Sequence, residues 1–239
     1  MKEASPPAGG WGGEHAAVPA TTCRTHAEID AVSTMSFVRS SVSINTWLSS
    51  LPSVDAVRPS RCPSCGAASR PYGEGLRLWG HGCVRRRVRG WISDDRPVPA
   101  SGETDVTLRR FRCVQAGCGS VILVGPAEWA PRRRYLRTAI ALALYLWSTL
   151  GQRHGDVYAA VTGLDSTRLD RPERWRTLGH WARSACAGVL FRALPRIAAT
   201  VLRRATVRAV MQALIGASPP STRGGPERVR LLAGAAHAM

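Results

Sequence analysis

Four cysteines form two pairs whose spacing is typical of a metal site. Cys62 and Cys65 are separated by two residues, Pro-Ser, and Cys113 and Cys118 by four, Val-Gln-Ala-Gly. The first spacing lets both sulfurs of a pair wrap one face of an ion, and the second lies within known zinc-ligand spacings. Four thiolates suit Zn²⁺ and leave no position for water. We therefore predict that Zn²⁺ has a structural and not a catalytic role here.

A glycine directly follows the last cysteine of each pair, at Gly66 and Gly119. A turn that points backbone N–H groups at sulfur is easier to make at glycine, which favours the metal site over two unrelated pairs of reduced cysteines. Two of the three remaining cysteines have simpler interpretations. We expect Cys83 to be a small hydrophobe on the buried face of a strand, and not a spare ligand beside His81. We expect Cys186 to lie in the core.

The elements that position these cysteines are predicted to be β-strands. Residues 61–125 are β-rich, and the interval between the two cysteine pairs supplies the ribbon hairpin. A polar, Pro-containing loop after Trp91 accounts for the length of that interval. A weak strand within 36–44 and a short helix capped by Asn45 precede the ribbon. The expected strands cover 76–81, 83–91, 106–112 and 120–124.

Helices are predicted to follow the ribbon. The strongest prediction covers 132–150, with Pro131 at its start and Gly151 at its end. A short helix is expected over 154–162, and another begins at the capping signature of Asp170 and Glu173. An amphipathic helix after Pro195 is expected to run to about Ile215.

The predicted fold class is α+β: a small β-rich zinc ribbon followed by an all-α, helix-turn-helix-like bundle. The turn before the third helix of the bundle, residues 163–170, is longer than the usual three or four. Met35 is an alternative start of the chain. The expected division is a disordered leader over 1–34, the ribbon domain over 35–125, the helical domain over 126–216 and a disordered tail over 217–239.

The charge balance points to a polyanionic partner. Of 239 residues, 33 are Lys or Arg and 16 are Asp or Glu, which gives a net charge of +17, and Lys2 is the only lysine. A GC-rich genome would explain the choice of arginine over lysine, but not the excess of basic residues. Nucleic acid is the favoured partner and an anionic membrane surface the weaker one.

The candidate DNA contacts lie in three groups of arginines. On an extended strand, Arg85, Arg87 and Arg89 would project opposite to Val84 and Val88. A second group crowds the start of the 132–150 helix, where cations are poorly placed for helix stability. A third occupies the helix after 170, whose Leu178 and Trp181 are expected in the core. A solvated outer face is the alternative for each group. The full set of predicted contacts is Arg85, Arg86, Arg87, Arg89, Arg109, Arg110, Arg132, Arg133, Arg134, Arg174, Arg176, Thr177, His180 and Arg183.

Several stretches resemble an uncharacterised bacterial family that pairs a zinc ribbon with a helical domain. The order is also similar to the N-terminal zinc-binding and helix-turn-helix region of insertion-sequence transposases. The resemblance covers about residues 36–190. It implies that the four paired cysteines are zinc ligands and that the helix around 175–183 reads DNA. The stretches are SFVRSSVSINTWLSSLPSVDAVRPSRCPSCG, GHGCVRRRVRGW, FRCVQAGCG, RRRYLRTAIALALYLW and RWRTLGHWAR.

This sequence departs from that pattern in two ways. The second cysteine pair is CVQAGC and not a tight CxxC, and the catalytic half of a transposase is missing. The acidic residues beyond Val124 follow no strand pattern that could converge on two metal ions. Motifs such as GxSxG, the P-loop and HExxH do not occur in the sequence. We therefore expect no enzyme and no small-molecule substrate.

The leading interpretation is a non-catalytic zinc-ribbon DNA-binding protein, as a transposon-derived accessory factor or a transcriptional regulator. The alternatives are a zinc-ribbon protein–protein adaptor and a non-functional remnant of a transposase. Neither a signal peptide nor an apolar run long enough to span a bilayer is visible. The expected location is therefore the cytoplasm, in association with the nucleoid.

Overall fold

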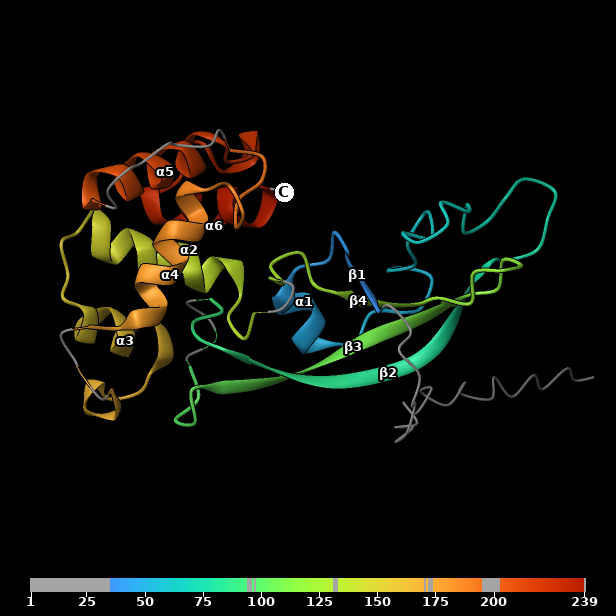
Figure 1. Ribbon diagram of the computed structural model, residues 1–239, viewed down its shortest axis with the longest axis horizontal. Helices are drawn as coiled ribbons and strands as arrows, with labels where there is room; N and C mark the ends of the chain where they lie inside the picture. The colour runs from blue at the N-terminus through green and yellow to red at the C-terminus, as the bar shows by residue number, and fades with distance from the viewer. Residues whose placement is uncertain are drawn as a thin grey trace, which may run out of the picture.

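A computed structural model describes residues 35–93, 96, 98–130, 133–169, 171, 174–194 and 203–238. A mixed β-sheet extends from one end, and most helices gather at the other (Figure 1). The predicted α+β class is confirmed, with the sheet preceding the helical region. Some predictions fall on residues outside the described ranges. These are the leader over 1–34, the helix start at Arg132, the capping signature of Asp170 and Glu173, and the break at Pro195.

The sheet has four strands in the order β1-β4-β3-β2. β1 (Ser36–Arg39) pairs in parallel with β4 (Val121–Gly125), and the other neighbours are antiparallel. β2 (Leu78–Arg89) and β3 (Glu103–Cys113) form the predicted ribbon hairpin. The strands predicted over 76–81 and 83–91 are one strand, because the register shifts between Gly80 and Cys83 without ending the pairing. Gly82, at φ 80°, takes up the extra residue of this bulge.

The short helix α1 (Ile44–Ser49) packs against β3, with Trp47 buried. Asn45 does not cap it, contrary to the prediction: the Ser43 side chain accepts the N–H of Thr46 at 3.3 Å. A second acceptor comes from far along the chain, since Glu128 Oε2 accepts the N–H of Ile44 at 2.8 Å. Burial raises the pKa of this carboxyl group. The helix start is therefore fixed by a long-range contact as well as by its own cap.

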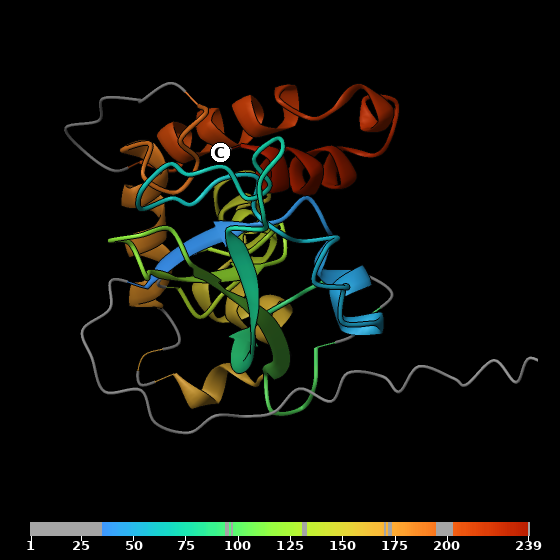
Figure 2. The ribbon, with the colours of Figure 1, turned by 90° about the vertical axis from the view of Figure 1, so that its right-hand side faces the viewer.

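The helical region is built around α2 (Arg137–Ser148), which contacts the four helices that follow it. In Figure 2, this helical region lies behind the hairpin, at the far end of the sheet. The helix predicted from 132 begins only at Arg137, because the described residues just before it are tied to β2. Tyr135 forms a β-bridge with Arg89, which donates its N–H to Arg134 O at 2.6 Å. The later helices are α3 (His154–Thr162), α4 (Arg176–Cys186), α5 (Arg204–Gly216) and α6 (Glu227–His237), with 3-10 turns η1 (Ser166–Arg168) and η2 (Pro220–Thr222).

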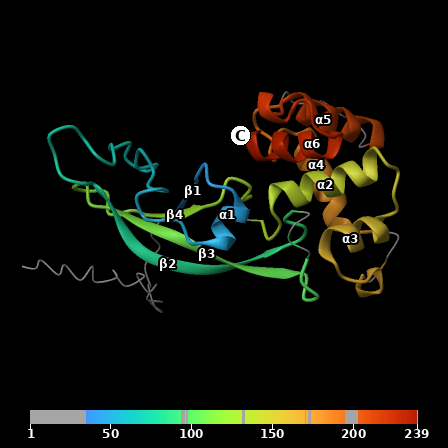
Figure 3. The same cartoon turned by 180° about the vertical axis from the view of Figure 1, so that it is seen from behind.

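The predicted disordered tail over 217–239 is wrong where α6 lies. This helix packs against α2 and α5 (Figure 3). Its Leu231 and Ala235 are fully buried. The approach to α5 is so close that a Cβ at Gly234 would lie 1.9 Å from Leu214 O. Small residues permit this approach, and the sequence around them has too few large apolar side chains to predict a buried helix. None of the helices in the described ranges is long and apolar enough to cross a membrane.

Candidate metal centre and nucleic-acid interface

The four paired cysteines meet at the end of the hairpin away from the helices. Cys62 and Cys65 lie in the loop before β2, Cys113 is the last residue of β3, and Cys118 lies in the β3–β4 connection. Their sulfur atoms all lie within 4.8 Å of one another. The Cys62–Cys118 and Cys65–Cys113 sulfurs are each 3.8 Å apart. A tetrahedral ion with Zn–S bonds of about 2.3 Å requires S–S distances of about 3.8 Å, so the cluster fits one tetrahedral metal ion.

Tight backbone turns hold the cysteines in this arrangement. Gly66 donates its N–H to Cys62 O at 2.9 Å and has φ 73°. Gly119 has φ 58°, so both glycines noted in the sequence occupy the left-handed region. Gly117, at φ 77°, is a third. A Cβ at any of the three would meet nothing within 4 Å. Backbone conformation and not space therefore requires glycine here, and Gly117 explains how the wider second spacing still forms a knuckle.

Ser120 is a neighbour of the cluster that sequence reasoning missed. Its hydroxyl lies 3.4 Å from the Cys62 sulfur and 3.2 Å from the Cys118 sulfur. Although burial opposes ionisation of Cys62, hydrogen bonds from Ser120 and from backbone N–H groups lower its pKa to about 6. Hydrogen bonding to Ser120 is also the main reason that the pKa of Cys118 is lowered. Burial raises the pKa of Cys113 to about 12. Ser120 thus favours the thiolate form of two of the four cysteines, and a bound cation would favour ionisation of all four.

Cys83 and Cys186 do not belong to the four-sulfur cluster. Both are buried as predicted, Cys83 on β2 and Cys186 on α4. Cys83 is disulfide-bonded, however, so it is not only the small hydrophobe that we predicted. The cluster itself lies near the surface, since Cys65 is exposed while Cys62 and Cys113 are buried.

The exposed arginines of β2 face acidic residues on β3. Arg85, Arg86 and Arg87 are exposed and Val88 is buried. The register places Arg87 opposite Asp105 and Arg89 opposite Glu103. Arg89 pairs with Glu103 at 2.6 Å, and Arg87 lies 3.6 Å from both acids. Part of the charge of this predicted contact strand is therefore neutralised within the hairpin.

The two arginines predicted on β3 bind the protein's own backbone. Arg109 Nε donates to Pro52 O at 2.9 Å, and Arg110 Nε donates to His81 O at 3.2 Å. Both side chains are half-buried, and burial lowers the pKa of Arg109. These arginines fasten the loop before β2 and the β2 bulge to the sheet. A structural role in the fold is therefore enough to explain both arginines, without a contact to DNA.

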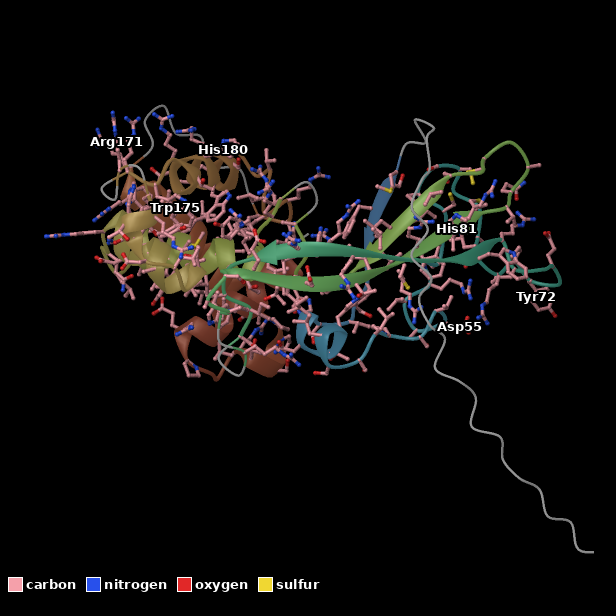
Figure 4. All side chains as sticks on the ribbon, turned by 90° about the horizontal axis from the view of Figure 1, so that it is seen from below. Asp55, Tyr72, His81, Arg171, Trp175 and His180 are labelled. Atoms are coloured by element: carbon pink, nitrogen blue, oxygen red, sulfur yellow. The ribbon has the colours of Figure 1, made fainter. Side chains whose placement is uncertain are left out.

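A cavity of about 900 Å³ lies where the other end of the hairpin meets α3 and α4. It brings together seven of the predicted DNA contacts: Arg89, Arg133, Arg134, Arg174, Arg176, Thr177 and His180. It also contains residues that the sequence did not single out, among them Arg171, Tyr135 and Tyr158. Arg171, Trp175 and His180 lie together at the helical end in Figure 4, far from Tyr72. Arg183 is exposed but does not line the cavity, and Arg132 lies outside the described residues.

A second cavity, of about 1490 Å³, continues along the sheet. It shares Arg89, Arg133 and Arg134 with the first cavity and adds Arg86 and Arg87. The two cavities therefore form a connected basic surface along one side of the hairpin.

Arg137, which also borders the second cavity, has an interior role. It is 5 % exposed and donates to Leu190 O at 2.8 Å and Ala238 O at 2.9 Å. Burial, followed by the charges of Arg39 and Arg192, lowers its pKa to about 10. It thus links α2 to the segment after α4 and to the residue that follows α6.

The predicted core positions of α4 are confirmed, but the surroundings of this helix differ from those of a protruding recognition helix. Arg176, His180 and Arg183 are exposed, while Leu178 and Trp181 are buried. The connection between α3 and α4 spans 163–175 and contains η1, so it is longer than the turn of a helix-turn-helix. The first turns of α4 form a cavity wall. Access to the N-terminal part of this face is therefore through the cavity.

Comparison with family models, curated proteins and solved structures finds no match. The resemblance to insertion-sequence transposases stays a prediction. A proposal of function therefore depends on the geometry of the cysteine cluster and of the arginine-lined cavities.

Proposed function

We propose that this protein binds DNA through the basic surface at the helical end of the hairpin, with a structural Zn²⁺ at the four-cysteine cluster. The observation that carries the proposal is the convergence of six arginines on one cavity that no described acidic residue lines. They come from β2, the segment before α2, the residues before α4 and the start of α4. Guanidinium groups bind phosphate oxygens with two parallel hydrogen bonds. Phosphate contacts of this kind supply affinity and fix orientation on DNA.

The metal in this proposal stabilises the fold and takes no part in chemistry. Four sulfurs complete a tetrahedral shell, and the S–S distances of 3.8 Å suit Zn²⁺. Its expected effect is to join the loop before β2, the end of β3 and the β3–β4 connection. The hairpin would then be a rigid arm whose far end carries Arg89 into the cavity.

Salt dependence tests the DNA-binding proposal. We expect a triple variant, Arg133→Ala, Arg174→Ala and Arg176→Ala, to weaken DNA binding and to flatten its salt dependence by about 2 to 3 units in log Kd against log salt, since each phosphate contact contributes about 0.9. The matched control removes three exposed arginines outside both cavities, Arg153, Arg168 and Arg223. Equal affinity and slope for wild type and the cavity variant in a fluorescence-anisotropy titration would contradict the proposal.

A protein-adaptor role is the second candidate, and one observation favours it. Tyr72, Trp79 and Val114 are large apolar or aromatic residues exposed at the cysteine end, at 104 %, 54 % and 54 %. Exposed apolar groups beside a rigid knuckle are suited to docking another protein. Binding through such a surface would change little with salt, whereas binding through the arginines weakens steeply.

A further inference from the structure

The 900 Å³ cavity has a cationic wall and an aromatic wall. This combination limits the kinds of ligand that the cavity suits. Six of its thirteen lining residues are arginines, and four are aromatic. A phosphate group alone needs only the cationic wall. A purely apolar ligand would leave the charge of the arginines without a partner. The cavity therefore suits a ligand that has an anionic part and a flat, apolar part.

Among the described residues, little negative charge neutralises the arginines of the cavity. Arg89 is paired with Glu103. Within the described ranges, the side chains of Arg133, Arg171, Arg174 and Arg176 form neither an ion pair nor a hydrogen bond. Like charges held around one cavity repel each other, and an anion between them removes that repulsion. Arg176 and Thr177, in the first turn of α4, also line the cavity, and a helix N-terminus favours a phosphate.

The aromatic wall is a packed array whose outer members remain accessible. Tyr135 contacts Trp181 edge to face, with ring centroids 4.8 Å apart, and Trp181 contacts Trp175 at 5.0 Å. Tyr158 completes the array, 5.4 Å from Trp175. The two tryptophans are almost fully buried, while Tyr135 and Tyr158 are half-buried and line the cavity. The tyrosine rings are therefore fixed from behind and offer a surface on which a planar ring can stack.

Size and shape distinguish an unpaired nucleotide from a double helix. A cavity of about 900 Å³ is in the range of sites that enclose small molecules. A duplex keeps its bases stacked inside two backbones, so it cannot bring a base to the tyrosines without unpairing it. A single strand can insert one base and keep its phosphates near the rim. The second cavity, which shares Arg89, Arg133 and Arg134, gives the adjoining strand a basic path.

We propose that the cavity lined by Tyr135, Tyr158 and six arginines binds one unpaired nucleotide of a DNA strand, with its base against the tyrosines and its phosphate among the arginines. The inference rests on the proposed DNA-binding function and sharpens it: the chain prefers single-stranded or locally opened DNA to an intact duplex. This is the combination of stacking and backbone charge by which proteins hold single strands.

The test compares three labelled DNA probes: a short mixed-sequence single strand, the same strand with abasic sites, and the matching duplex. Fluorescence anisotropy at low salt reports affinity, and quenching of tryptophan emission reports occupancy near Trp175 and Trp181. We expect the normal single strand to bind about tenfold more tightly than either other probe, which is the order expected for one base–aromatic stack.

Variants locate the binding to the cavity. Tyr158→Leu is expected to weaken binding of the normal strand about tenfold and leave the abasic strand nearly unchanged. Tyr72→Leu, at a fully exposed tyrosine outside both cavities, is the matched control and should change neither. Circular dichroism confirms that each variant is folded. If Tyr158→Leu unfolds the protein, Tyr158→Phe, which keeps the ring, replaces it and should retain the preference for the normal strand over the abasic one.

The outcomes separate the two proposals. Equal binding of all three probes, lost on removal of the arginines, would overturn the nucleotide site and leave DNA binding intact. Loss of the base preference in Tyr158→Phe would also overturn the site, because the stacking ring is still present. Failure of every probe to bind at low salt would overturn both. Binding of inorganic phosphate as tight as that of the normal strand would show an anion site without base recognition, and would overturn the inference.

Discussion

The two ends of the β2–β3 hairpin assemble their functional groups in different ways. At the cysteine end, four side chains come from two short turns, and backbone hydrogen bonds within each turn set their positions. At the arginine end, the side chains come from β2, the segment before α2, α3, the residues before α4 and α4 itself. The first arrangement depends on local geometry and a bound ion. The second depends on how separate helices pack against the sheet.

The largest expected effect comes from removing ligands of the four-cysteine cluster. Cys62→Ser with Cys65→Ser deletes half of the proposed ligand shell, and we expect loss of bound metal and unfolding of the ribbon. Structural zinc sites contribute on the order of 10 kcal/mol of binding free energy in small domains. Metal analysis and thermal unfolding measure the result. Cys186→Ala, at a buried cysteine outside the cluster, should keep its metal. A double variant with undiminished zinc would contradict the ligand assignment.

The second prediction perturbs the packing that supports the arginine end. Gly234→Ala should destabilise the protein by about 3 kcal/mol or more, because the new Cβ would lie 1.9 Å from Leu214 O and force α6 away from α5. Gly216→Ala is the matched control, since nothing lies within 4 Å of a Cβ there. Urea unfolding measures both changes. Equal stability of the two variants would show that the close contact between α5 and α6 does not form.

The third prediction separates arginines that build the fold from those available to a ligand. Arg109→Ala should lower the free energy of unfolding by about 2 kcal/mol, because a half-buried charged group loses its hydrogen bond to Pro52 O. Arg86→Ala removes an exposed side chain that lines the second cavity, and should change stability by less than about 0.5 kcal/mol. Arg86→Ala should instead reduce DNA affinity. Urea unfolding and anisotropy on the same pair of variants check this division, and the reverse pattern would contradict it.

The same contrast explains which features could be predicted from the sequence. The cysteine ligands were predictable because ligand type and spacing are local signals, as were Gly66 and Gly119. The α+β class and the bounds of α3 follow from periodic patterns and end signals. By contrast, three arginines that look alike in the sequence have different surroundings. Arg85 is exposed, Arg109 donates a hydrogen bond to a backbone carbonyl group, and Arg176 lines a cavity. Only tertiary packing decides between these roles.

Two of the wrong predictions have the same physical origin. The start of α2 moves to Arg137 because Arg89 binds Arg134 O, a contact between residues far apart in sequence. The helix α6 forms within a segment that has few large apolar side chains, because Gly234 lets it approach α5 closely. Tyr135 and Tyr158 were likewise missed, since each is an isolated aromatic residue until the helices bring them together. Long-range contacts thus determine the arginine end.

The smallest expected effect concerns a histidine behind the aromatic wall of the cavity. Trp175 donates its backbone N–H to His154 Nδ1 at 2.9 Å, so this nitrogen must be unprotonated. Burial, followed by the charge of Arg204, lowers the pKa of His154. The folded state therefore binds this proton less readily than the unfolded chain. The stabilisation is present above the unfolded pKa of about 6.5 and is lost as pH falls through that value toward the folded pKa.

His154→Asn keeps an acceptor but does not titrate. Urea unfolding of both proteins between pH 7 and pH 5, a range set by that ordinary pKa, should show a steeper loss of stability in wild type. Parallel pH profiles would mean that His154 does not hold Trp175 in place, and the aromatic wall would then depend on ring packing alone.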